Sequence, residues 1–196
     1  MERKIAELLA GKTIEVVHDG NMQKAVLAYG YELIITSLFG VFLLVALSFA
    51  IGLPGAWIPF VLGFAPLRTT AGGYHAPTHL RCYITTVAIF ACCVAVAKYV
   101  VSSYVHLLII AAITGAIILA FAPVAANNKP LSEARRARNR KRSIAISVIL
   151  FAVSVILCLT RYSDFYIALY FVGSLAASVS LVVAKVLNLS WKGETL

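Results

Sequence analysis

The chain has 196 residues, of which 61% are hydrophobic and only 13% charged. Soluble domains are roughly 45–50% apolar, so this composition, with a mean hydropathy of +0.92, excludes a soluble domain and predicts an integral membrane protein. The formal net charge is +9. The basic residues lie at the ends of apolar runs, a pattern that favours cytoplasmic flanks touching anionic lipid and argues against nucleic-acid binding.

The length suits one membrane domain, residues 1–196, with several spans of about 20 residues each. Three of the four cysteines (Cys92, Cys93 and Cys158) lie inside apolar runs, which predicts small core residues and no disulfide framework. The first apolar run begins near Ala25 and exceeds the roughly 7–15 residues of a signal-peptide core, so we expect the N-terminus to stay attached.

The first 20 residues place Ile5, Leu8 and Leu9 on one helical face among charged residues, and Asp19 and Gly20 then break the pattern. This predicts an amphipathic helix at the membrane interface, with docking of a partner peptide as the alternative. A first span is expected from Asn21, a candidate N-cap, to the Pro54-Gly55 stop.

The next apolar run, residues 56–67, is short for a straight span and contains Pro59 and Pro66. It is expected to form a short, proline-broken crossing or a re-entrant segment. Either geometry indicates a polar cleft, because non-helical backbone at membrane depth must be buried in protein or line water.

Four further apolar runs complete an all-α, polytopic fold with about six transmembrane segments. From a cytoplasmic N-terminus, this count places residues 67–82, residues 127–142 and the C-terminus on the cytoplasmic side of the membrane. The four runs are residues 83–105, 106–126, 143–160 and 165–187.

The interval 127–142 carries seven of the seventeen Lys and Arg residues, which indicates a basic cytoplasmic loop. We expect a short surface helix after Pro130, with Ser132 or a neighbour as its cap. Its arginines could attract an acidic peptide tail, although contact with anionic lipid is the simpler interpretation.

The interval 67–82, with the sequence LRTTAGGYHAPTHLRC, is polar and broken by glycine between apolar runs. Cys82 is a candidate nucleophile because it would fall near the start of a helix that begins at Pro77 or is capped by Thr78, and helix N-termini and cations favour a thiolate. His75 is the candidate base. Seven residues along one straight helix would separate it from Cys82 by about 10.5 Å, so the chain must fold back between them for proton transfer.

Two other interpretations of this interval stay open. His75, His79 and Cys82 have the H-x3-H-x2-C spacing of three zinc ligands, although the HExxH pattern and a fourth ligand are missing. The interval could also be an ordinary polar connection.

The residues RTTAGGYHAPTHLRC and the later block APVAANNKPLSEARRARNRKR resemble the two signatures of the AgrB family, membrane-embedded cysteine endopeptidases of Gram-positive quorum sensing. The resemblance implies His75 as general base and Cys82 as nucleophile, with Arg68 and Gly73 in supporting roles. It implies no cofactor or metal. The partner would be an AgrD-like precursor peptide, cleaved through an acyl-enzyme thioester and cyclised to a thiolactone or lactone.

Further candidate residues lie outside the interval 67–82. Glu32, Arg135 and Arg136 are candidate substrate contacts, and Glu32, Asn127 and Asn128 are candidates for a residue that orients His75. Membrane lipids are expected partners, and a homodimer is left open. A small transporter or channel with a polar cleft at residues 67–82 is the alternative function.

Overall fold

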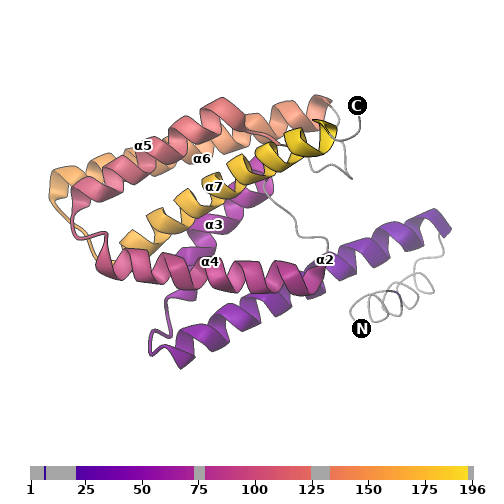
Figure 1. Ribbon diagram of the computed structural model, residues 1–196, viewed down its shortest axis with the longest axis horizontal. Helices are drawn as coiled ribbons and strands as arrows, with labels where there is room; N and C mark the ends of the chain where they lie inside the picture. The colour runs from indigo at the N-terminus through magenta and orange to yellow at the C-terminus, as the bar shows by residue number, and fades with distance from the viewer. Residues whose placement is uncertain (1–6, 8–20, 73–77, 125–132, 194–196) are drawn as a thin grey trace.

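A computed structural model describes residues 7, 21–72, 78–124 and 133–193 (Figure 1). The described chain is helical and contains no strand, as predicted. Its long helices are α2 (Asn21–Ala50), α3 (Trp57–Ala71), α4 (His79–Tyr99), α5 (Tyr104–Phe121), α6 (Glu133–Thr160) and α7 (Phe165–Gly193). The expected interfacial helix over residues 1–20 lies outside the described residues, apart from Glu7.

Successive helices run in opposite directions, so the ends of α3, α5 and α7 and the starts of α4 and α6 lie toward the same end of the bundle (Figure 1). A backbone hydrogen bond of 2.9 Å from the Val124 N–H to the Ala71 carbonyl oxygen joins the chain after α5 to the last residue of α3. We call this end of the bundle the site end.

Five helices are long and apolar enough to cross a membrane: α2, α4, α5, α6 and α7. Helix α3 has 15 residues and is therefore only about 22 Å long. It is the short segment expected from the sequence, but it continues as one helix through Pro66 and reaches Ala71. Pro59 destabilises the helix little because it lies in the first turn, where backbone N–H groups have no helical partner.

Helix α3 packs inside the bundle, mainly against α7. Phe60 and Leu67 are almost fully buried, and the Phe60 ring meets Phe90 of α4 edge to face with centroids 5.0 Å apart. At Gly63 the two backbones come so close that a Cβ atom would overlap the Tyr170 carbonyl oxygen of α7. Small residues permit such approaches between helices in membranes, and here the approach fixes α3 relative to α7.

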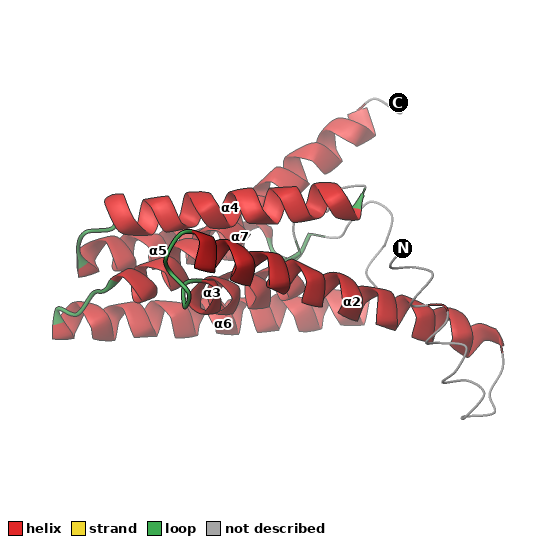
Figure 2. Ribbon diagram, turned by 90° about the horizontal axis from the view of Figure 1, so that it is seen from below, coloured by secondary structure: helices red, strands yellow, loops and turns green. Residues whose placement is uncertain are grey.

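Helix α2 lies on the outside of the bundle, and its first turns reach beyond the other helices (Figure 2). Large apolar side chains such as Leu38, Phe42 and Phe49 are exposed along it. In a chain with five candidate spans, such a surface is suited to contact lipid. The helix ends at Ala50, with Gly52 at a φ of 72°, slightly before the Pro54-Gly55 stop expected from the sequence.

Helix α6 corrects one prediction. The basic stretch was expected to form a separate short helix after Pro130, but the residues from Glu133 onward form the first turns of the same 28-residue helix that contains the following span. No Gly or Pro interrupts residues 133–160, and Ala, Glu, Arg and Lys favour helix. The cationic turns are therefore held in line with the span at the site end.

Candidate functional site

Cys82 lies in the first turns of α4, as predicted. Thr78 is the N-cap residue: its backbone is extended, and its hydroxyl accepts a hydrogen bond of 3.4 Å from the Arg81 N–H. The Cys82 N–H then donates to the Thr78 carbonyl oxygen at 3.1 Å. The sulfur is thus positioned near the positive end of the helix dipole, on a helix whose start is fixed by a cap.

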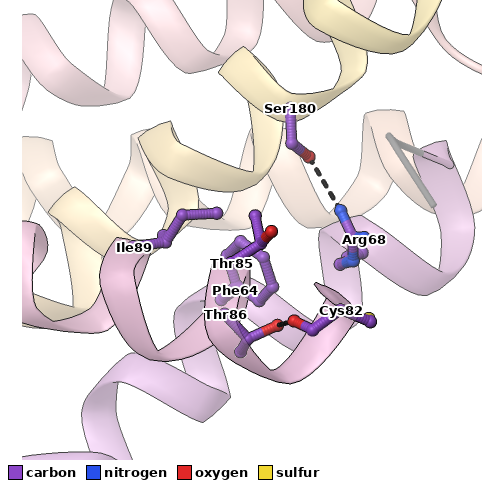
Figure 3. A pocket seen from close by; sticks show the side chains of 7 residues that line it. All are labelled: Phe64, Arg68, Cys82, Thr85, Thr86, Ile89 and Ser180. Atoms are coloured by element: carbon purple, nitrogen blue, oxygen red, sulfur yellow. Dashed lines mark hydrogen bonds between the residues drawn. The ribbon is translucent and has the colours of Figure 1, made fainter. Parts of the chain in front are cut away.

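A small pocket beside Cys82 brings together side chains from three helices (Figure 3). Its volume is about 20 Å³, which is room for about one water molecule. A peptide would therefore have to bring its carbonyl group to the mouth of the pocket. The lining residues are Phe64 and Arg68 from α3, Cys82, Thr85, Thr86 and Ile89 from α4, and Ser180 from α7.

Arg68 is the charged group of this pocket. Its Nη1 atom donates a hydrogen bond of 3.2 Å to the Ser180 hydroxyl, and its guanidinium carbon lies 5.5 Å from the centre of the Phe64 ring. Arg68 and Cys82 line the same pocket. An arginine side chain keeps its proton in proteins, so a cation lies in the pocket beside Cys82.

His79 is directed away from this pocket, toward α2. Its Nδ1 atom lies 3.2 Å from the Thr36 hydroxyl, and its Nε2 atom lies 3.5 Å from the Glu32 carboxylate. Both ring nitrogens therefore have partners on α2, whereas Cys82 faces α3 and α7. This arrangement argues against His79 as the base for Cys82.

The same arrangement weakens the zinc interpretation, because His79 and Cys82 face different helices. Among the described residues, no group of three His, Cys, Asp or Glu side chains could hold a metal ion. His75, the third residue of that pattern, lies outside the described residues.

The structure describes some of the other candidate residues. Arg68 and Cys82 line the same pocket, and Glu32 contacts His79 at the start of α4. Arg135 and Arg136 are exposed in the first turns of α6, at the site end. The remaining candidates, His75, Gly73, Asn127 and Asn128, lie outside the described residues, so their roles stay predictions.

Sequence reasoning did not single out Ser180. It is 112 residues from Arg68 in the chain and lies within an apolar helix that also contains Ser174 and Ser178. The only available signal was this group of small hydroxyl residues, which does not distinguish one serine from the next.

Gly72 joins the candidate site to the end of α5. Its φ of 88° and ψ of −165° belong to a region that residues with a side chain essentially never occupy, and a Cβ atom would overlap the Val124 carbonyl oxygen. The residue therefore permits both the sharp exit from α3 and the contact with the segment that follows α5.

Gly72→Ala is expected to displace this connection. Backbone strain should lower the free energy of unfolding by about 1–3 kcal/mol, and the clash should lower it further. Any activity of the site should fall strongly. Membrane insertion should persist, because the five long helices are unchanged. The matched control is Gly115→Ala in α5, where a Cβ atom meets nothing within 4 Å. Thermal unfolding of both purified variants checks the prediction, and equal melting temperatures would contradict it.

The fold and site define a class: a polytopic helical membrane protein with a cysteine and a half-buried arginine that line one pocket at one end of the bundle. The family model AgrB, described as accessory gene regulator B, matches residues 3–183 of the chain, and the chain belongs to this family. The AgrB family is associated with the processing of AgrD in quorum sensing. Searches of curated proteins and of solved structures gave no match.

Proposed function

We propose that this protein is a membrane-embedded cysteine endopeptidase that cleaves an AgrD-like precursor peptide on its C-terminal side and promotes cyclisation of the product. The observation that carries the proposal is that Cys82, at the capped start of α4, lines the same pocket as Arg68 of α3. Family membership supplies the substrate class.

In the first step, His75 takes the thiol proton and the Cys82 sulfur attacks the carbonyl carbon of the scissile peptide bond. The new C–S bond forms, the C–N bond breaks, and the leaving amine receives the proton held by His75. The product is a thioester between Cys82 and the new carboxyl end of the peptide. Arg68, which lines the same pocket as Cys82, would support the attack by stabilising the negative charge that develops on the carbonyl oxygen.

In the second step, a cysteine within the precursor attacks the thioester. Its proton passes to the departing Cys82 sulfur, a thiolactone forms, and the enzyme is restored without consuming water. One thioester replaces another, so this exchange is nearly balanced in free energy, and removal of the product or of the cleaved tail must draw it forward. A serine in the same position would give a lactone.

The bundle offers surfaces that suit such a substrate. A precursor lying on the inner leaflet would meet the site end if that end is cytoplasmic, as the basic start of α6 favours. Arg135 and Arg136 are exposed there and would attract an acidic tail or anionic lipid. Glu32, which contacts His79, would lie on the α2 side of the site.

The test is processing of a synthetic precursor by the protein reconstituted in vesicles. Cleavage should be abolished by a thiol-alkylating reagent and unaffected by a chelator. Inhibition by the chelator with no effect of Cys82 alkylation would replace the cysteine mechanism with a metal site. Passage of intact peptide across the vesicle without cleavage would favour the transporter alternative.

A further inference from the structure

Three serines of α7 are buried, but they make different contacts. Ser174 donates to backbone carbonyl oxygens, at 3.3 Å to Gly63 and 3.0 Å to Tyr170. Ser178 donates to the Leu175 carbonyl oxygen at 2.8 Å. Ser180 also donates a hydrogen bond to a backbone carbonyl oxygen of its own helix, but in addition it accepts one from a charged side chain on another helix.

The hydroxyl of Ser180 is held in one orientation. It donates its proton to the Ala177 carbonyl oxygen at 2.7 Å, which leaves its lone pairs for the Arg68 Nη1–H at 3.2 Å. The side chain is buried, with 8% of the residue exposed. Ser180 is therefore a fixed acceptor on the helix that packs most closely against α3.

Arg68 needs such an acceptor because its long side chain has many rotamers and ends in a half-buried cation. The Phe64 ring contacts the guanidinium, but such a contact fixes the orientation of the guanidinium less tightly than a hydrogen bond does. The hydrogen bond to Ser180 therefore holds the guanidinium at the pocket that Cys82 also lines (Figure 3).

We propose that Ser180 is a positioning residue of the site: it holds the Arg68 guanidinium beside Cys82, where it meets the negative charge that develops during acyl transfer. When the sulfur attacks, the carbonyl π electrons move to the oxygen, and donors placed in advance stabilise that oxyanion without reorganising. When the intermediate collapses, the charge leaves the oxygen and the thioester remains. Ser180 acts only through Arg68. This inference rests on the proposed function for its substrate, but not for its geometry.

The experiment compares Ser180→Ala with Ser178→Ala, a matched loss of a buried hydroxyl two residues away on α7. In reconstituted protein, Ser180→Ala should slow precursor processing by roughly tenfold, less than the roughly 10²–10³-fold loss typical when an oxyanion donor itself is removed. Ser178→Ala should process at the rate of the unmodified protein. Ser180→Thr, which keeps the hydroxyl, should retain most of the rate.

A second readout does not depend on the precursor. The rate at which iodoacetamide modifies Cys82 at neutral pH, followed by mass spectrometry of the peptide that contains it, should fall several-fold in Ser180→Ala and not in Ser178→Ala. The reason is that the thiolate is the form that reacts, and a displaced guanidinium would no longer lie in the pocket beside it. Equal alkylation in the two variants, or equal loss in both, would overturn the positioning role. If neither the unmodified protein nor any variant processes the precursor but the alkylation rates differ as predicted, the proposed function fails, and the positioning of Arg68 beside Cys82 by Ser180 stands.

Discussion

Cys82→Ser and His75→Ala are each expected to abolish precursor processing, with losses of about 10⁴-fold or more, as found when a nucleophile or its base is removed. The sulfur forms the covalent intermediate, so a hydroxyl of similar size but far weaker acidity cannot replace it at neutral pH. Without the imidazole, neither the thiol proton nor the leaving amine has a proton carrier. Co-expression of each variant with the precursor, followed by analysis of the peptide products, measures the effect.

The matched control for the cysteine is Cys92→Ala, one of the other cysteines of α4. Cys92 is exposed on the surface of the bundle, and processing should continue in this variant. Membrane fractions must show that all three variants are inserted. Intact processing by either Cys82→Ser or His75→Ala would reject the proposed mechanism.

Arg68→Ala is expected to reduce processing by about 10²–10³-fold, the range typical for loss of one oxyanion-stabilising donor. The folded state should survive, because removing a half-buried cation also removes its desolvation cost. Arg68→Lys should recover only part of the rate, since an ammonium group keeps the charge but lacks the planar fork that bonds Ser180 and lies in the pocket beside Cys82. Initial rates and melting temperatures, measured on the same preparations, separate chemistry from stability.

Lys98→Ala is the control for general loss of positive charge. Lys98 lies in the last turn of α4, at the opposite end from Cys82, and is exposed. Its loss should leave processing unchanged. A similar decline in Lys98→Ala and Arg68→Ala would mean that net charge, and not the placement of the guanidinium, controls the rate.

Much of the fold was predictable because hydrophobic runs report directly on spans. The start of α4 at Thr78 was also predictable, since threonine caps helices and the following residues carry a continuous helical pattern. The course of α3 was not. Its two prolines suggested a break, but Pro59 lies in the first turn and the bundle holds the helix together through Pro66.

The candidate site was predictable only in part. The motif and the polar interval indicated Cys82 and Arg68, and the structure places both at one pocket. Ser180 and the Val124 contact of Gly72 were not predictable, because each depends on which helices become neighbours. The direction of His79 also depends on packing: the zinc interpretation required it to face Cys82, but its contacts with Glu32 and Thr36 direct it toward α2.

The central claim is that Cys82 carries the peptide as a thioester, and the mass of the intact protein tests it most directly. A precursor whose cyclising cysteine is replaced by alanine cannot complete the second step, so the acyl-enzyme should accumulate. We expect the protein to gain the mass of the acylating peptide fragment, to lose it on treatment with hydroxylamine, and to show no gain in Cys82→Ala. Cleavage of the precursor without such an adduct, or the same adduct in Cys82→Ala, would contradict the mechanism.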